Sequence, residues 1–208
     1  KADKKQIQYL DDKQALQFMD ALEKEPLEYQ AIFSILLLTG MRRGELLGLE
    51  WPDIDLDERV IHIRRTSQYA PGAGIYTDTT KTEQSKRPLS IPAELADLLR
   101  RYRVEQGERR LRVGDRWSPE WAEHPRLFTQ WDGKPMHPNA PYQELQKLLQ
   151  RNGLPKVSLH SLRHTNASML IAQGVDVRTV AGLLGHAQPS TTLDIYSHTF
   201  DKNKKLAQ

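Results

Sequence analysis

Residues 29–49 read YQAIFSILLLTGMRRGELLGL, and this stretch decides the fold. If its first ten residues form a helix, nearly every side of that helix is apolar, which predicts that the helix is deeply buried. The six residues TGMRRG then break the apolar pattern, and a second, short helix is expected directly after them. Backbone N–H groups at such a break point outward and attract anions, which places Arg42 and Arg43 beside an anion site. The alternative is that both are ordinary exposed arginines in a loop.

Helical patterns extend on both sides of this stretch. Apolar residues recur at helical spacing after the N-cap region at 9–12, and Pro26 ends that helix. Further along the chain, apolar periodicity and glycine stop signals predict five more helices. These helices are expected over residues 92–112, 142–149, 159–172, 175–184 and 191–197.

Short extended segments lie between the helices. Strands are expected over residues 60–63, 77–82, 86–91 and 127–129. Two segments show no clear period: 69–76 is expected to be a loop, and 114–125 a surface loop or insertion. The sequence therefore predicts a mainly helical protein with a small antiparallel β-sheet, an α+β fold.

The composition excludes several classes of protein. Hydrophobic residues make up 38% and charged residues 27% of the 208 residues, as in a soluble globular protein. The absence of cysteine excludes disulfides, thiolate metal sites and cysteine nucleophiles. The longest apolar run is too short to span a bilayer and the N-terminus is polar, so we expect a cytoplasmic protein with no membrane partner. Thirty Lys and Arg against 27 acidic residues permit nucleic acid as a partner without requiring it.

A histidine and an arginine three residues apart, His160 and Arg163, face the same side of the helix expected over 159–172. Arginine binds a phosphate through two parallel N–H bonds, and histidine can donate, accept or transfer a proton near neutral pH. His160 and His164 also have a spacing that suits zinc. However, Ser161 stands where the zinc protease pattern needs glutamate, and Arg163 would place a positive charge beside the metal. We therefore expect no metal site there.

Four more residues are candidates on weaker grounds. Glu45 follows Arg42 by three residues and can orient a basic neighbour. Lys81 lies in an extended segment, from which its long side chain can reach a site. His186 follows a helix end, and Tyr196 follows a short capped helix. Each also has a common alternative, such as a solvent-exposed lysine or a tyrosine in the core.

Together these segments resemble the tyrosine recombinase, or phage integrase, family. The resemblance is carried by five segments in the family's order and spacing, and it runs from about Tyr9 to Tyr196. The segments are TGMRRGEL at 39–46, TKT at 80–82, HSLRHT at 160–165, LGH at 184–186 and Tyr196. Each segment is weak alone, but the combination is specific. The HSLRHT form is most similar to integrases of phages and conjugative transposons of Gram-positive bacteria.

By this resemblance six residues are catalytic, and Glu45 supports the first arginine. The six are Arg42, Lys81, His160, Arg163, His186 and Tyr196. Tyr196 is implied to be the nucleophile, the two arginines and His186 to bind the phosphate, and Lys81 to protonate the leaving oxygen. For His160 two roles stay open, accepting the tyrosine proton or holding the phosphate. No metal or other cofactor is implied.

The resemblance implies a metal-independent, site-specific recombinase that integrates or excises a mobile element through a 3′-phosphotyrosine intermediate. Its expected partners are double-stranded DNA at attachment or transposon-end sites, further copies of itself in a homotetramer, and accessory proteins for excision or DNA bending. Residues 1–208 are expected to be a fragment, the catalytic domain with the tyrosine recombinase fold, without the N-terminal core-binding domain or an arm-binding domain. The expected location is the bacterial cytoplasm, on DNA.

Three alternatives stay open. A type IB topoisomerase shares this chemistry but reseals the original strand. A DNA-binding protein with an inactive recombinase fold would lack Tyr196 or an arginine, and this sequence has all of them. A metal-dependent nuclease is disfavoured because the sequence has no clustered carboxylates near the basic residues.

Overall fold

The computed structural model describes residues 8–79 and 86–185. The predicted site residues divide between the described and the remaining parts of the chain. Those within the described ranges are Arg42, Glu45, His160 and Arg163. Those outside them are Lys81, His186 and Tyr196, together with the helix expected over 191–197.

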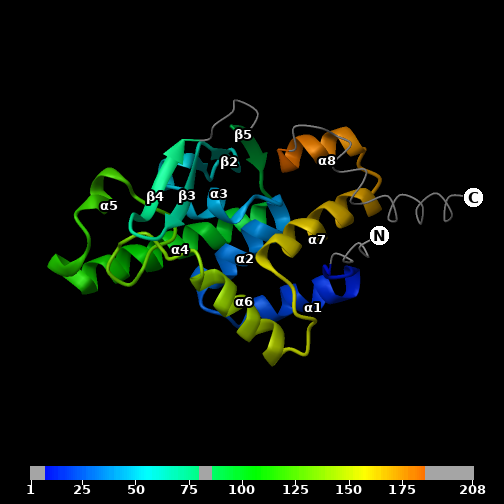
Figure 1. The fold of residues 1–208 in the computed structure, drawn as a ribbon, viewed down its shortest axis with the longest axis horizontal. Helices are drawn as coiled ribbons and strands as arrows, with labels where there is room; N and C mark the ends of the chain where they lie inside the picture. Colours follow the sequence, from blue (N-terminus) through cyan, green and yellow to red (C-terminus); the bar gives the residue numbers. More distant parts are fainter. Residues whose placement is uncertain (1–7, 80–85, 186–208) are drawn as a thin grey trace, which may run out of the picture.

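Helix α2 (Leu27–Thr39) is the central element of the helical body (Figure 1). It is apolar on all sides and largely buried, so the expectation of a deeply buried helix is confirmed. Five helices pack against it, which explains why no side of it is polar. They are α1 (Asp12–Leu22), α3 (Arg43–Leu47), α4 (Ala93–Val113), α6 (Ala140–Arg151) and α7 (Leu159–Ala172).

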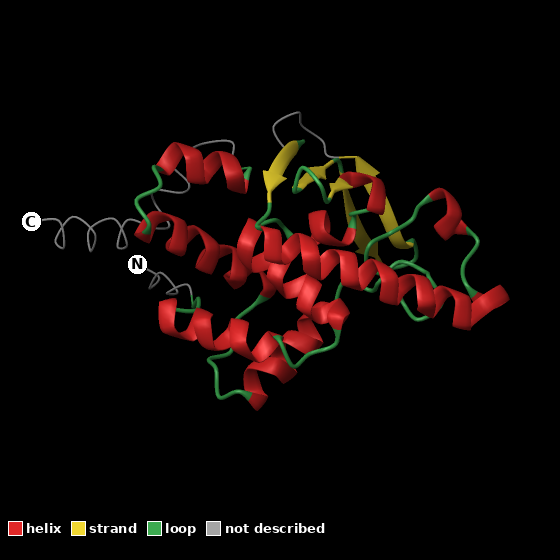
Figure 2. Cartoon of the chain, turned by 180° about the vertical axis from the view of Figure 1, so that it is seen from behind, coloured by secondary structure: helices red, strands yellow, loops and turns green. Residues whose placement is uncertain are grey.

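Two small antiparallel sheets lie along one side of the helical body, as Figure 2 shows from behind. The first contains β1 (Ile54–Asp55), β2 (Val60–Ile63) and β5 (Arg87–Ser90), with β2 in the middle. The second is a hairpin of β3 (Arg65–Ala70) and β4 (Gly74–Thr79). The predicted α+β class is confirmed, with the small sheet divided in two.

Helices α7 and α8 (Val177–Leu184) begin at side-chain caps that the sequence supplies. The hydroxyl of Ser158 accepts a hydrogen bond from the backbone N–H of Ser161, and the carboxylate of Asp176 accepts two from the start of α8. Helix α8 ends at Gly185, which has φ of 63°. Among the described residues, the remaining helical turns are short: η1 (Trp51–Asp53), η3 (Gly114–Arg116) and α5 (Glu120–Glu123).

The end of α2 and the end of α8 are packed closely together. A small apolar cluster joins α7 to α8 through Ala167 and Ile171 on one side and Val180 and Leu184 on the other. Gly40, which ends α2 with φ of 63°, lies against both helices. A Cβ atom at Gly40 would come within 2.7 Å of a side-chain atom on α7 and another on α8. Only glycine fits there, and the missing side chain lets the end of α2 pack directly against α7 and α8.

Three sequence-based expectations were wrong in part. Residues 69–76 are not a loop, because Tyr69 pairs with Ile75 in the β3–β4 hairpin and only 71–73 turn. Residues 127–129 do not form a strand within a sheet; isolated bridges at Arg126 and at Thr129 stand there instead. The segment 114–125 contains short helical turns, and its Trp117 is buried, with its ring edge-to-face on Trp121. In the described part of the chain, no helix has the length and apolar character that crossing a bilayer demands.

Candidate active site

Arg42 stands just before α3, where the chain turns out of the buried helix α2. Its backbone N–H donates to Glu45 Oε2 at 2.8 Å, and its Nη1 donates to Glu45 Oε1 at 2.9 Å. Its Nη2 donates to the carbonyl oxygen of Gly185 at 3.0 Å. The side chain is nevertheless 43% exposed, so the guanidinium is held on one side and accessible on the other. Such a guanidinium suits a phosphate arriving from solvent.

Glu45 is the acidic partner of this arginine and is only 1% exposed. Burial by itself would raise the pKa of its carboxyl. The hydrogen bonds and charge of Arg87, and then those of Arg42, outweigh that effect and lower the pKa below its usual value. The carboxylate is therefore ionised at neutral pH. The structure places Glu45 directly beside Arg42.

Arg163 enters the same region from α7 and is buried. Its Nη1 donates to the carbonyl oxygen of Gly40 at 2.7 Å, and its Nη2 donates to the carbonyl oxygen of Leu184 at 2.6 Å. One guanidinium thus joins the end of α2 to the end of α8. A buried arginine held by two backbone carbonyls has a fixed orientation, as a residue that aligns a phosphate must have.

His160 lies one turn before Arg163 on α7 and keeps an exposed surface. Its ring stacks edge-on against buried His164, with the ring centroids 4.7 Å apart. Partial burial of the ring, and then the charges of Arg163 and Arg42, lower the pKa of His160. The imidazole is therefore neutral at physiological pH and able to accept a proton. His160 and Arg163 lie on the same helix, and Arg163 and Arg42 bind adjacent carbonyl oxygens at the end of α8, so the structure brings all three residues into one region.

Three arginines bind three successive carbonyl oxygens at the end of α8. Leu183 accepts from Arg87 Nε at 2.8 Å, Leu184 from Arg163 and Gly185 from Arg42. The C-terminal end of a helix carries partial negative charge, which favours cations at this position. The predicted residue His186 follows Gly185 directly in the sequence, although its own placement is not described.

Arg87 was missed by reasoning from the sequence. It precedes Pro88 in an extended segment and carries no motif of its own beyond one more positive charge. Its partners, Glu45 and Leu183, are distant in the sequence, so only the folded chain reveals them.

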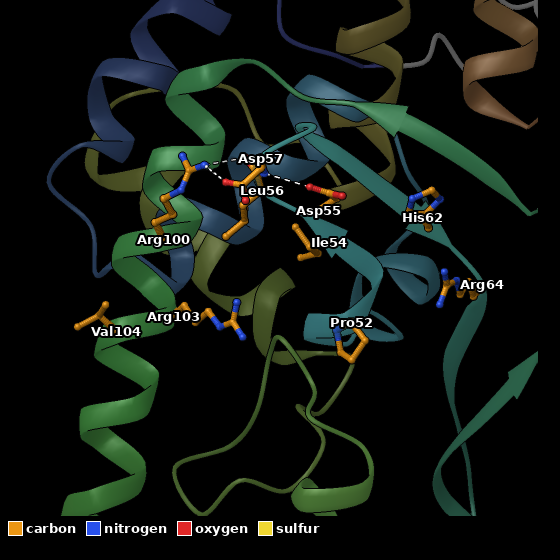
Figure 3. Close-up of a pocket in the computed structure, with 10 residues that line it drawn as sticks. All are labelled: Pro52, Ile54, Asp55, Leu56, Asp57, His62, Arg64, Arg100, Arg103 and Val104. Atoms are coloured by element: carbon orange, nitrogen blue, oxygen red, sulfur yellow. Dashed lines mark hydrogen bonds and ion pairs between the residues drawn. The ribbon is translucent and has the colours of Figure 1, made fainter.

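A wide hollow on the described surface lies elsewhere (Figure 3). It has a volume of about 860 Å³ and lies between α4 and the strands β1 and β2. Its basic and acidic side chains partly neutralise one another, since Arg100 is hydrogen-bonded to Asp57 at 3.1 Å. None of the predicted catalytic residues within the described ranges lines it. We therefore place the candidate active site at the exposed arginine and histidine, and not in this hollow.

Within residues 8–79 and 86–185, no three histidine or acidic side chains gather as metal ligands. Guanidinium groups supply positive charge at the site, and they keep their protons at any physiological pH. His160 and His164, the pair with zinc-like spacing, stack against each other edge to face.

Comparison with known proteins identifies the family. The model of the phage integrase family matches residues 8–203. A tyrosine recombinase XerC-like protein of Caldanaerobacter subterraneus is 32% identical over 210 aligned positions, and the alignment covers 97% of this chain and 53% of that protein. The ICEBs1 integrase of Bacillus subtilis is 30% identical over 191 residues, covering 91% of this chain and 50% of that protein. The chain thus spans about half the length of these curated relatives.

Solved structures agree with the sequence comparison. The Tn1549 transposon integrase in complex with circular intermediate DNA superposes with a TM-score of 0.77 at 25% identity, over 96% of this chain and 66% of that one. The XerA recombinase superposes with a TM-score of 0.72 at 26% identity, over 96% of this chain and 63% of that one. The predicted tyrosine recombinase fold and the likeness to integrases of Gram-positive phages and conjugative elements are confirmed.

Proposed function

The chain belongs to the phage integrase family, and we propose on this premise that residues 1–208 are the catalytic domain of a site-specific DNA recombinase. One observation carries the proposal. Arg42 and Arg163 come from distant parts of the chain and bind adjacent carbonyl oxygens at the end of α8, and burial together with the charges of both arginines lowers the pKa of His160. Two fixed guanidiniums beside a neutral imidazole suit a phosphodiester whose negative charge increases during reaction.

In the proposed reaction the hydroxyl of Tyr196 attacks a DNA phosphorus atom. The bond between phosphorus and the 5′ oxygen breaks, leaving a 3′-phosphotyrosine and a 5′-hydroxyl. The number of phosphoester bonds is unchanged, so a 5′-hydroxyl from another strand can reverse the step without an energy source. Attack by that foreign strand exchanges the DNA ends and releases Tyr196.

Each remaining site residue has a proposed task in this reaction. Arg42 and Arg163 bind the non-bridging phosphate oxygens, and His186 donates a further hydrogen bond to them. Lys81 protonates the leaving 5′ oxygen. The lowered pKa of His160 suits the acceptor of the tyrosine proton, because a neutral imidazole has a free lone pair. The same neutral ring also has one N–H that can donate a hydrogen bond to the phosphate, so both roles of His160 stay in the proposal.

The proposed partner is double-stranded DNA at the attachment sites or ends of a mobile element. This is supported by the Tn1549 integrase, which was solved in complex with transposon circular intermediate DNA. A homotetramer, accessory proteins for excision or DNA bending, and a cytoplasmic, DNA-associated location complete the proposal. Strand exchange between two duplexes needs four cleavages, which is the reason to expect four copies.

Recombination is favoured over topoisomerase activity because the matching relatives are integrases and recombinases. The two activities differ only in which 5′-hydroxyl attacks the phosphotyrosine. A labelled foreign strand with a free 5′-hydroxyl therefore separates them. A recombinase joins the labelled strand to the DNA that is held as the phosphotyrosine, whereas a topoisomerase reseals only the original strand.

The experiment that tests the proposal uses a pool of synthetic duplexes with randomised sequence. Each duplex carries a nick placed so that cleavage releases a short oligonucleotide and traps the protein on DNA. A covalent adduct that resists denaturing electrophoresis supports the proposal, and sequencing the trapped DNA yields a substrate. The adduct should form equally well in EDTA. No adduct from the pool, or activity lost in EDTA and restored by magnesium, would contradict the proposal.

A further inference from the structure

Arg87 lies at the first position of β5 and reaches out of the sheet toward two other elements. Its Nη1 and Nη2 donate to the two oxygens of Glu45 at 3.2 and 3.1 Å. Its Nε donates to the carbonyl oxygen of Leu183 at 2.8 Å. Figure 1 shows β5 beside α8, in agreement with this contact. One side chain therefore joins the sheet, α3 and the last turn of α8.

The surroundings of Arg87 hold it in this place. Its side chain is only 9% exposed, and its backbone is paired with Ile63 of the central strand β2. A Cβ atom at Gly185 would lie 2.8 Å from Arg87 Nη1, so the glycine leaves room for the guanidinium. The guanidinium thus has little freedom, and its fork is matched to the Glu45 carboxylate.

We propose that Arg87 is a positioning residue of the active site, which aligns Arg42 through Glu45 and holds the end of α8 that leads to His186. The proposal rests on the proposed function, because it assigns Arg87 a role in DNA cleavage. Arg87 itself is directed at protein acceptors and is mostly buried, so it acts through its neighbours. Arg42, in contrast, is 43% exposed and shares the same carboxylate.

A guanidinium is needed for this role, and a positive charge is not enough. Within the described part of the chain, Arg87 donates to two carboxylate oxygens and one carbonyl at once. Lysine presents a single ammonium at the end of a flexible stem and has no planar fork. Arg87→Lys should therefore keep the charge that stabilises Glu45 while losing the alignment. Substitution by lysine separates geometry from simple ion pairing.

The test compares Arg87→Lys and Arg87→Ala with the unchanged chain on the duplex recovered from the randomised pool. Single-turnover cleavage at saturating DNA should fall about 10- to 100-fold in both variants, the order expected when catalytic groups are misplaced. The dissociation constant for DNA should change less than about threefold. The matched control is Arg100→Ala, an exposed arginine of α4 paired with Asp57 and Asp97, which should cleave at the normal rate.

The outcomes are separable. Adduct formation by the unchanged chain establishes the proposed function independently of Arg87. If Arg87→Lys melts like the unchanged chain and cleaves at the same rate, the positioning role is wrong. If the loss appears only in DNA affinity, Arg87 is a DNA contact and the proposal is also wrong.

Coupling between Arg87 and Glu45 is tested by combining the Arg87 substitution with Glu45→Gln. The double variant should cleave about as slowly as the slower single variant. If the two losses multiply, Arg87 does not act through Glu45.

Discussion

Arg163 in α7 donates a hydrogen bond of 2.6 Å to the carbonyl oxygen of Leu184, the last residue of α8. The same guanidinium binds Gly40 at the end of α2. A residue predicted to bind a phosphate therefore also joins two helix ends. Movement of α8 would move the acceptor of Arg163, and through Gly185 the acceptor of Arg42. The positions of the two arginines are thus coupled through the backbone of one helix turn.

The nucleophile is tested by Tyr196→Phe. We expect DNA affinity within a few-fold of the unchanged chain, because the ring is retained, and no covalent adduct, because the attacking oxygen is absent. Binding is measured by gel shift and the adduct by denaturing electrophoresis, both on the duplex from the randomised pool. Adduct formation by the Phe variant at the normal level would show that another residue attacks the DNA.

The ionised state of Glu45 leads to a pH-dependent stability difference. The pKa of Glu45 is lowered in the folded chain from its ordinary value of 4.5, so its ionised form stabilises the fold. This stabilisation is fully present above about pH 4.5 and is lost as the pH falls through the folded-state pKa. Glu45→Gln should therefore lower the melting temperature most near pH 7, and the difference should shrink below pH 4.

The control for this prediction is Glu108→Gln, a change on the exposed surface of α4. It should alter the melting temperature little at any pH, because surface substitutions of this kind have small effects. A difference for Glu45→Gln that is constant from pH 7 to pH 3 would contradict the assignment of an ionised, stabilising carboxylate.

Part of the fold and of the site could be predicted because the signals are local. The bounds of α7 agree with the range expected from the sequence, since the cap Ser158 and the stop at Gly174 lie beside the helix itself. The segment with Arg42 and Glu45 was recognised for the same reason. Helix α2, the short break after it and helix α3 are consecutive in the sequence, so their signals are local.

The features that could not be predicted depend on distant contacts. Residues 69–76 in the middle of the β3–β4 hairpin were expected to be a loop because of their turn residues, while the pairing register of the two strands exists only in the folded chain. In α1, the apolar residue Leu16 is 64% exposed, because α2 covers the opposite side of the helix, which carries Phe18. Arg87 likewise acquires its role only when β5 meets α8.

Gly40 offers a test of how closely the helix ends must pack. Gly40→Ala would place a Cβ atom 2.7 Å from atoms of Asn166 and Leu184 and would keep the left-handed φ of 63°. Gly153→Ala is a matched control, because Gly153 has φ of 64° and no atom lies within 4 Å of its Cβ position. Urea unfolding should show the Gly40 variant less stable than the Gly153 variant by about 1–3 kcal/mol, the usual cost of overpacking. Equal losses would mean that backbone strain alone decides the effect.

The role of Lys81 can be separated from that of Arg42 by changing the leaving atom. General acid catalysis is typically worth about 100- to 10,000-fold, so Lys81→Ala should cleave ordinary DNA slowly. When sulfur replaces the bridging 5′ oxygen, the leaving thiolate needs no proton, because a thiol has a pKa near about 8.5. Lys81→Ala should then cleave at nearly the normal rate. Arg42→Ala should stay slow on both substrates, since charge on the non-bridging oxygens is unaffected by the sulfur. If Lys81→Ala is equally slow on both, another residue is the general acid, and His160 is the next to test.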